Sequence, residues 1–239
     1  MRPLIVIPTY NEAANIRAIL PRVFAAVPRA AVLVVDDASP DGTAREVRRA
    51  ARRRAGRVHL ILRPAKLGLG TAYVAGFRFA LAGPFDPVVQ MDADGSHDPS
   101  AIPRLLAALR RNDGVVGSRY GAGLRVTNWP WSRLMLSLLA NRYARAVTGV
   151  PLSDLTGGFN GWRRGILARI GPERLRCNGY AFQIELKCRC HQLGGRMAEL
   201  PIVFAGRVEG KSKLSRRVIL EAILAVWRMR LQAASVRSG

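Results

Sequence analysis

The sequence predicts an α/β fold in which a mostly parallel β-sheet carries helices on both faces. Short apolar runs, typical of buried strands, alternate along the chain with longer segments whose apolar residues recur at helical spacing. Polar residues follow directly on several of these runs, and open α/β sheets bind ligands beyond the carboxyl ends of their strands. With 239 residues, 49% of them hydrophobic, and no Gly/Ser-rich or Pro-rich linker, the chain is long enough for one core and is not divided into two.

The first half of the chain supplies most of the predicted sheet. Apolar runs that predict strands lie at residues 4–7, 31–35, 58–62 and 87–91. Asn11 is expected to cap the first helix, because apolar residues at helical spacing follow it. A basic helix is expected to begin near Thr43, after a turn at 39–42. Another helix is expected over residues 71–81, after a glycine-bearing loop at 66–70.

The second half predicts more helix than strand. Helices are expected over residues 98–111, 131–147, 179–193 and 215–231, and strands over 114–118 and 197–204. Residues 1–214 form the predicted α/β domain, and residues 215–239 a basic amphipathic helix and tail that packs on this domain or lies on a membrane. The longest uncharged stretch of that helix, 222–227, falls short of the roughly 20 residues that a membrane span needs. The apolar run at 4–7 is too short for a signal peptide, so neither a signal peptide nor a span is predicted.

The composition restricts the partners and the compartment. A net charge of +22, supplied almost entirely by arginine, favours anionic partners such as nucleic acid or an acidic membrane. The three cysteines, Cys177, Cys188 and Cys190, form a sparse and odd set, which is typical of a reducing compartment such as the cytosol. Their spacing matches no common zinc site.

An acidic motif, Asp92-Ala93-Asp94-Gly95-Ser96-His97, follows directly on the apolar run at 87–91. Alternate residues of an extended segment share a side, so Asp92 and Asp94 point the same way, and Ser96 follows them if the extension persists. Mg²⁺ or Mn²⁺ held by one or two carboxylates keeps positions that a substrate's phosphates can fill. The motif therefore predicts a divalent metal site for a diphosphate ligand.

Two other interpretations of this motif compete with the metal site. A bare Asp-x-Asp is more often a polar turn after a buried strand, so other segments must support the metal. An EF-hand calcium loop is excluded, because its sixth and twelfth positions require Gly and Glu, where this chain has His97 and Pro103. Support comes from residues 8–12 and 36–37, which follow other predicted strands and are expected at the same sheet edge. No Gly-x-Gly-x-x-Gly follows the first strand, which argues against a dinucleotide cofactor.

Six segments carry a family resemblance when they are taken together and in chain order. They are IPTYNE at 7–12, VDDASPDGT at 35–43, KLGLGTAY at 66–73, DADGSHD at 92–98, GSRY at 117–120 and RVEGKSKL at 207–214. They resemble the dolichyl- and polyprenyl-phosphate mannosyltransferases, which are family 2 glycosyltransferases of the GT-A fold, and VTNWPW at 126–131 is similar to the actinobacterial polyprenol monophosphomannose synthases. The resemblance implies transfer of mannose from GDP-mannose to polyprenyl phosphate, with inversion at the anomeric carbon, by a peripheral protein at the cytoplasmic face of the membrane.

The resemblance also implies roles for individual residues. Positions that hold the nucleoside are matched by Pro8, Tyr10, Glu12, Val35 and Asp37, with Ala93 beside the nucleotide. Positions that hold Mg²⁺ or Mn²⁺ are matched by Asp92, Asp94 and the side chain or a water at Ser96. The lipid phosphate is expected at Arg119, Arg133 and Ser137, and the donor phosphates at Arg207 and Lys213. Asp94 and Arg119 are the expected catalytic residues. Because the acceptor phosphate is largely a dianion at neutral pH, it needs no general base, and His97 is not expected to serve as one.

Three alternatives remain. The nearest is a polyprenyl-phosphate glucosyltransferase using UDP-glucose, because such enzymes share the front half of the pattern. A non-catalytic nucleic-acid-binding protein would explain the charge, but no recognition motif is present and the acidic strand ends would repel a phosphate backbone. A peripheral membrane scaffold would leave Asp92 and Asp94 without a purpose. The expected partner surface is therefore an anionic membrane rather than nucleic acid, and the sequence leaves open whether a separate membrane-anchoring protein is needed.

Overall fold

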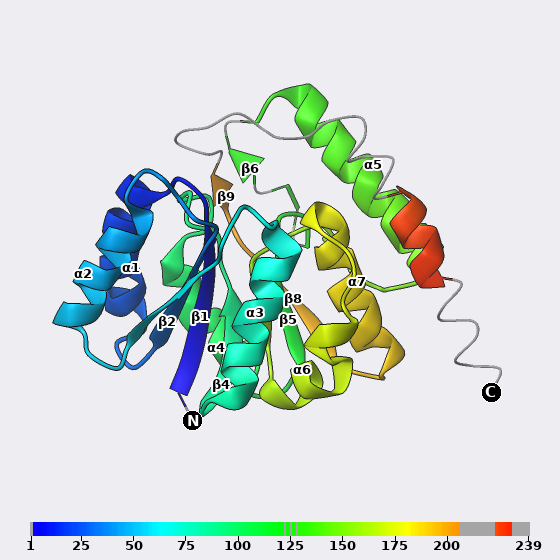
Figure 1. Cartoon of the computed structure of the whole chain (residues 1–239). Helices are drawn as coiled ribbons and strands as arrows, with labels where there is room; N and C mark the ends of the chain where they lie inside the picture. The colour runs from blue at the N-terminus through cyan, green and yellow to red at the C-terminus, as the bar shows by residue number, and fades with distance from the viewer. Residues whose placement is uncertain (1, 122, 125, 128, 206–222, 231–239) are drawn as a thin grey trace.

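Seven strands form one sheet in the computed structural model, which describes residues 2–121, 123–124, 126–127, 129–205 and 223–230 (Figure 1). The strand order is β3-β2-β1-β4-β7-β5-β8, and all strands run parallel except β7, which pairs antiparallel with β4 and β5. Their bounds are β1 Arg2–Thr9, β2 Ala31–Asp36, β3 Val58–Leu62, β4 Phe85–Gln90, β5 Gly114–Ser118, β7 Asn160–Trp162 and β8 Met197–Pro201. The predicted mostly parallel sheet is confirmed.

Helices cover both faces of the sheet, as the alternating pattern predicted. Between the first residue and residue 205, the described α-helices are α1 Ala13–Ala26, α2 Thr43–Arg53, α3 Leu69–Ala82, α4 Ile102–Ala108, α5 Trp131–Thr148, α6 Arg164–Ile170 and α7 Gly179–Gln192, and the 3₁₀ turns are η1 Pro99–Ala101 and η2 Pro172–Arg174. Successive residues of a strand point to opposite faces, so Ile5 and Ile7 of β1 pack with α1, α2 and α4. Leu4 and Val6 pack with α3, α6 and α7. Both faces of the central strands are therefore buried, as parallel sheets require.

The described part of the C-terminal helix, residues 223–230, packs on this domain. Val226 and Met229 share an apolar cluster with residues of α5 and α7, and Tyr143 Oη of α5 donates a hydrogen bond of 3.1 Å to the Ile223 carbonyl. The predicted boundary between residues 214 and 215 lies outside the described residues. Within the described part of the chain, we find no helix that combines the length and the hydrophobicity needed to cross a bilayer.

Several elements differ from the prediction. The prediction that Asn11 caps α1 is wrong, because Asn11 has a φ of 61° and Glu12 occupies the cap position. The pattern predicted neither α6 nor β7, which is three residues long with Trp162 as its one large apolar side chain. The strand predicted over residues 197–204 is shorter in the structure, where β8 ends at Pro201. A short strand, β9 (Phe204–Ala205), follows it and pairs with β6 (Val126–Thr127) outside the main sheet.

Candidate active site

The carboxyl ends of β1, β2 and β4 meet at one edge of the sheet, the upper edge in Figure 1. Thr9 at the end of β1 donates through Oγ1 to Asp36 Oδ1 (2.8 Å), and Ser39 Oγ donates to the same oxygen (2.6 Å). The backbone N–H of Asn11 in turn donates to Ser39 Oγ (2.9 Å). The fully buried Asp36 thus fixes the loops that follow β1 and β2.

The acidic motif lies in the loop that follows β4. Asp92 accepts a hydrogen bond of 3.3 Å from Tyr73 Oη at Oδ1, and its side chain is 32% exposed. Burial, together with the neighbouring carboxylates of Asp92 and Asp94, raises the pKa of Tyr73, so its hydroxyl stays a donor. Asp94 is buried, and its Oδ1 accepts from the backbone N–H (3.1 Å) and the hydroxyl (2.5 Å) of Ser96.

The extension that would align Ser96 with the two carboxylates does not persist. The chain turns at Gly95, whose φ is 76°, and brings Ser96 back onto Asp94. Ser96 therefore orients the Asp94 carboxylate. If the Ser96 hydroxyl also bound the metal ion, it would have to do so while donating its hydrogen bond to Asp94. Asp92 and Asp94 still offer the oxygen donors that Mg²⁺ and Mn²⁺ prefer. No third His, Cys, Asp or Glu joins them among the described residues, so water and phosphate oxygens would complete the shell.

His97 has a structural role in this loop. Its Nδ1 accepts a hydrogen bond of 3.1 Å from the backbone N–H of Asp92, so this nitrogen carries no proton in that arrangement. The ring is almost fully buried, stacks on Phe159 at 5.0 Å and meets the Phe204 ring edge at 5.5 Å. These contacts hold the loop that presents Asp92.

Asp37 is bound to a residue that the sequence did not single out. Its carboxylate forms a buried ion pair with Arg63 and accepts from the backbone N–H groups of Leu67 (3.1 Å) and Gly68 (3.2 Å). Arg63 also donates to the Gly68 carbonyl (2.8 Å). Asp37 thereby ties the end of β2 to the glycine-bearing loop, and the nucleoside contact assigned to it stays a prediction. The position of Arg63, directly after β3, was the signal available in the sequence.

The other predicted nucleoside residues lie on β1, β2 and the loop after β1. Pro8 is paired in register with Val35, whose side chain is fully buried, so a ligand contact by Val35 would come from its backbone. Lys66 Nζ lies 4.0 Å from the centre of the Tyr10 ring. Glu12 Oε2 accepts from Asn15 Nδ2 (2.5 Å) at the start of α1. Ala93, the remaining member, is buried.

Arg119, at the end of β5, is held in a buried ion pair. Its Nε donates to Asp154 Oδ2 (2.7 Å), and its Nη2 donates to Asp154 Oδ1 (2.6 Å) and Thr156 Oγ1 (2.7 Å). Burial opposes ionisation of Asp154, but the Arg119 guanidinium outweighs it and holds the pKa of this carboxyl below its usual range. Arg119 is therefore oriented rigidly, since a bidentate pair fixes the plane of the guanidinium.

The predicted lipid-phosphate residues lie around two aromatic side chains, Trp129 beside both arginines and Tyr120 beside Arg119 and Ser137. The Cζ atoms of Arg119 and Arg133 lie 5.5 and 4.1 Å from the centre of the Trp129 ring, as in cation–π contacts. Ser137, one turn after Arg133 on α5, accepts a hydrogen bond of 2.7 Å from Tyr120 Oη. The structure thus brings these three predicted residues together. Arg207 and Lys213, the predicted donor-phosphate residues, lie outside the described residues.

The loop at 153–159, which was not predicted from the sequence, lies between the acidic motif and Arg119. Asp154 holds Arg119, and a Cβ atom placed on Gly158 would lie 3.9 Å from both carboxylate oxygens of Asp92. Lys187 of α7, fully buried, donates through Nζ to the carbonyls of Leu155 (3.0 Å) and Gly157 (2.8 Å). Burial lowers the pKa of Lys187 to about 7. An acidic residue followed by paired glycines before an apolar residue was the available signal.

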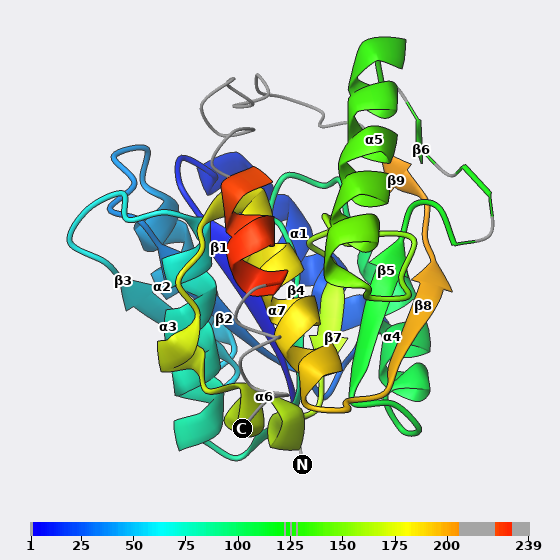
Figure 2. The same ribbon diagram turned by 90° about the vertical axis from the view of Figure 1, so that its right-hand side faces the viewer.

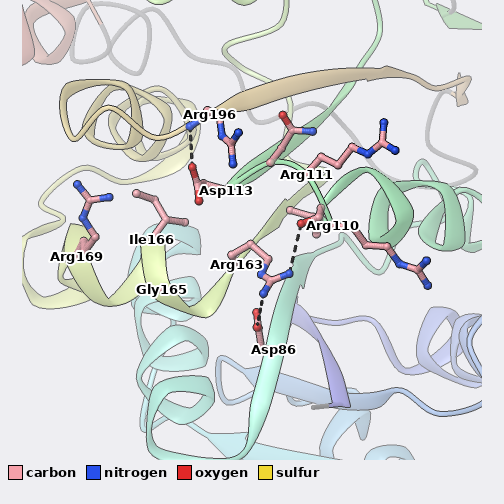
Figure 3. Close-up of a pocket in the computed structure, with 11 residues that line it drawn as sticks. Asp86, Arg110, Arg111, Asp113, Arg163, Gly165, Ile166, Arg169 and Arg196 are labelled. Atoms are coloured by element: carbon pink, nitrogen blue, oxygen red, sulfur yellow. Dashed lines mark hydrogen bonds and ion pairs between the residues drawn. The ribbon is translucent and has the colours of Figure 1, made fainter.

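A separate hollow of about 390 Å³ opens at the opposite edge of the sheet, near the starts of β5 and β8 (Figure 3). Five of the eleven residues that line it are arginines, and both of its carboxylates have partners. Asp86 pairs with Arg163 (3.3 Å), and Asp113 accepts from the backbone N–H of Arg196 (2.8 Å). None of the predicted site residues lines this hollow, so the candidate site is the loop cluster at the carboxyl ends of the strands.

Comparison with known proteins adds independent evidence. Residues 4–171 match the family model Glycosyl transferase family 2. The chain is 45% identical, over 98% of its length and 96% of the relative's, to an undecaprenyl-phosphate mannosyltransferase of Micrococcus luteus. It is also 45% identical, over 94% of its length and 85% of the relative's, to a polyprenol monophosphomannose synthase of Mycolicibacterium smegmatis.

Solved structures share the fold. Glucosyl-3-phosphoglycerate synthase from Mycobacterium tuberculosis, in complex with Mn²⁺, UDP-glucose and phosphoglyceric acid, has a TM-score of 0.67 at 18% identity, covering 96% of this chain and 79% of that one. The same enzyme with Mg²⁺ and UDP has a TM-score of 0.62 at 19% identity, covering 99% and 79%. At these identities the likeness establishes the fold, which is GT-A.

Proposed function

The chain belongs to the family 2 glycosyltransferases, and on this premise we propose that it transfers mannose from GDP-mannose to polyprenyl phosphate with inversion at the anomeric carbon. Its relatives at 45% identity are named for the synthesis of polyprenyl-phosphate mannose, so the class of enzyme is a polyprenyl-phosphate mannosyltransferase. The choice of GDP-mannose as donor and the inversion are what the proposal adds.

The observation that most strongly supports this function is the position of Phe204 beside both the acidic motif and Arg119. The Phe204 ring lies against His97, which holds the acidic motif, and its centre is 5.6 Å from Arg119 Cζ. A donor diphosphate at the acidic motif and an acceptor phosphate at the arginines would therefore meet across one aromatic side chain. This juxtaposition suits transfer between two phosphate-bearing substrates, because catalysis depends on holding both in reacting geometry.

Asp92 and Asp94 would hold Mg²⁺ or Mn²⁺, with Ser96 keeping the Asp94 carboxylate oriented. When bound, the ion would offset the negative charge that develops on the departing nucleoside diphosphate. The donor set consists of oxygen atoms, as hard divalent cations prefer, and the structural neighbours were crystallised with Mn²⁺ or Mg²⁺.

The acceptor side needs positive charge rather than a base. A phosphate monoester is largely a dianion at neutral pH, so its oxygen is already nucleophilic. Arg133 would bind this phosphate, and Arg119, fixed by Asp154, would present a guanidinium in a set direction. Arg207 and Lys213 would neutralise the donor phosphates.

The acceptor's prenyl chain requires access to a membrane, and α5 offers a surface for it. Trp131 and Leu139 are 72% and 59% exposed, and Met135, Leu136 and Leu138 are exposed beside them. The helix projects past the other described helices (Figure 2). We place the enzyme peripherally on an anionic membrane at its cytoplasmic face, with this part of α5 against the lipid.

The purified chain should be assayed with polyprenyl phosphate and Mn²⁺ or Mg²⁺ against GDP-mannose and UDP-glucose in parallel. The expected result is a lipid-linked mannose with the anomeric configuration opposite to that of the donor, established by NMR. Preference for UDP-glucose would replace the proposed donor, and retention of configuration would refute the proposed mechanism. Activity that persists in EDTA would refute the proposed requirement for a divalent metal ion.

A further inference from the structure

Behind Asp92, three buried amide side chains form a hydrogen-bonded cluster whose orientation can be derived. Trp162 Nε1 can only donate, so Gln90 turns its Oε1 toward it (2.8 Å). The Gly157 carbonyl can only accept, so Asn160 turns its Nδ2 toward that oxygen (3.1 Å). Asn160 Nδ2 also donates to Gln183 Oε1 (3.0 Å). The amide nitrogen of Gln183 therefore points away from the cluster.

This nitrogen is buried without a hydrogen-bond partner among the described residues. Gln183, on α7, is only 3% exposed, and leaving a buried donor unpaired is unfavourable. A Cβ atom placed on Gly158 would lie 3.6 Å from Gln183 Nε2 and 3.9 Å from each carboxylate oxygen of Asp92, with no nearer atom outside residues 157–159. Gly158 thus leaves a space that an amide donor bounds on one side and a carboxylate on the other.

We propose that this space receives a hydroxyl group of the donor's sugar ring, which makes Gln183 a sugar-binding residue. A hydroxyl can accept from Gln183 Nε2 and donate toward Asp92, whereas a phosphate placed there would be repelled by the carboxylate. Asp92 has two oxygens with several lone pairs, so this contact is compatible with its role toward a metal. The inference rests on the proposed function, because it takes the diphosphate to lie at Asp92 and Asp94.

Two variants test the two walls of the space. Gln183→Leu removes the donor, and Gly158→Ala fills the space with a methyl group that makes only ordinary contacts at 3.6 Å or more. Matched controls are Gln192→Leu, at an exposed glutamine near the end of α7, and Gly165→Ala, where an added Cβ meets nothing within 4 Å. Thermal unfolding of all four variants identifies any that fail to fold.

The measurement is the Kd of GDP-mannose and of GDP, each with Mn²⁺, by calorimetry. Gln183→Leu and Gly158→Ala are expected to weaken GDP-mannose by roughly tenfold, as for one lost hydrogen bond, and to leave GDP within about twofold of wild type. Neither control should change either value.

Equal weakening of GDP and GDP-mannose by these variants, or no weakening of GDP-mannose in a folded Gly158→Ala protein, would refute the sugar contact and leave the proposed function intact. A wild-type chain that binds neither ligand would refute the proposed donor and this inference with it. If Gly158→Ala alone weakens GDP-mannose, the space receives the sugar but Gln183 does not contact it, and the assignment to Gln183 fails.

Discussion

Asp94 is buried and one of its carboxylate oxygens accepts from Ser96, so the informative substitution is the isosteric Asp94→Asn. In Asp94→Asn, the amide oxygen can still accept from Ser96 while the negative charge is lost. We expect kcat/KM for transfer to fall by roughly 10²–10³-fold, the range for removing one group that stabilises transition-state charge, at an unchanged Tm. A metal-dependent Asp94→Asn enzyme with wild-type kcat/KM would contradict the assignment.

Ser96→Ala separates support of Asp94 from direct metal ligation. Because the hydroxyl donates to Asp94 in the structure, its loss is expected to weaken Mn²⁺ activation by roughly 10-fold to 100-fold, as for groups that orient a metal ligand. Activity as a function of Mn²⁺ concentration measures this. Saturating Mn²⁺ should restore most of kcat, whereas a loss of kcat that no Mn²⁺ concentration restores would indicate that the hydroxyl itself ligates the ion.

Lys187 predicts a specific dependence of stability on pH. Burial lowers its pKa from 10.5 to about 7 in the folded chain, so above pH 7 the unfolded chain binds a proton that the folded chain does not. The contribution of Lys187 to the free energy of unfolding therefore rises with pH above about 7. Urea unfolding of wild type and Lys187→Met at pH 6.5 to 8.5 should show the wild type gaining stability relative to the variant.

An exposed lysine serves as the control for this series. Lys66→Met should keep the same difference from wild type at every pH in the range, because Lys66 is exposed to solvent in both states. A Lys187→Met difference that is flat with pH would show that the ammonium group stays charged in the folded chain. The three cysteines, whose thiol pKa values burial raises to about 11 or 12 in the folded state, are common to wild type and both variants, so their own effect of pH on stability cancels in each difference.

At the scale of elements, α5 is expected to dock on the lipid surface. Leu139→Ser removes a side chain that is 59% exposed on this helix, and Leu62→Ser removes one that is 51% exposed on β3, near the other end of the sheet. Burying a leucine in lipid is worth about 1.5–3 kcal/mol, so Leu139→Ser should weaken vesicle binding by roughly tenfold. Flotation with liposomes measures it, and equal loss in the Leu62→Ser control would refute docking through α5.

The elements also show where sequence patterns suffice. Strands β1 to β5 and the helices between them were predicted because apolar periodicity encodes burial directly. β7 was not predicted, because Asn160 and Gly161 are not apolar and the strand is defined by its pairing with β4 and β5. Gly161 is required there because a Cβ atom would lie 2.1 Å from the Leu105 side chain. Pairing and close approach are tertiary facts that a single sequence does not encode locally.

For the candidate site too, local sequence patterns predicted some residues, and tertiary contacts determined the others. Asp92, Asp94, Arg119 and Arg133 could be placed because they follow strands or occupy motifs, and the structure brings both pairs to one edge of the sheet. Partners chosen by the tertiary fold could not be placed. Asp154 meets Arg119 from 35 residues further along the chain. Buried ion pairs of this kind leave no spacing rule in the sequence.

At the scale of the whole molecule, the chain carries a net charge of +22, and among the described residues arginines lie on more than one part of the surface. Arg110 and Arg111 line the hollow at the edge of the sheet opposite to the candidate site (Figure 3). Arg142 and Arg145 are exposed on α5. Only charges within about a Debye length, roughly 8 Å at physiological ionic strength, are attracted appreciably to a membrane surface. Position on the molecule should therefore matter more than total charge.

Two double variants with the same loss of charge test this. Arg142→Gln with Arg145→Gln should weaken binding to anionic vesicles by roughly tenfold or more at physiological salt, because each arginine near an anionic surface contributes about 1 kcal/mol. Arg110→Gln with Arg111→Gln should leave vesicle binding within about twofold, since that edge would face away from a bilayer contacted by α5. Equal losses would mean that the overall field attracts the protein without a fixed orientation. Stronger binding to duplex DNA than to anionic vesicles at the same salt concentration would instead favour the nucleic-acid alternative.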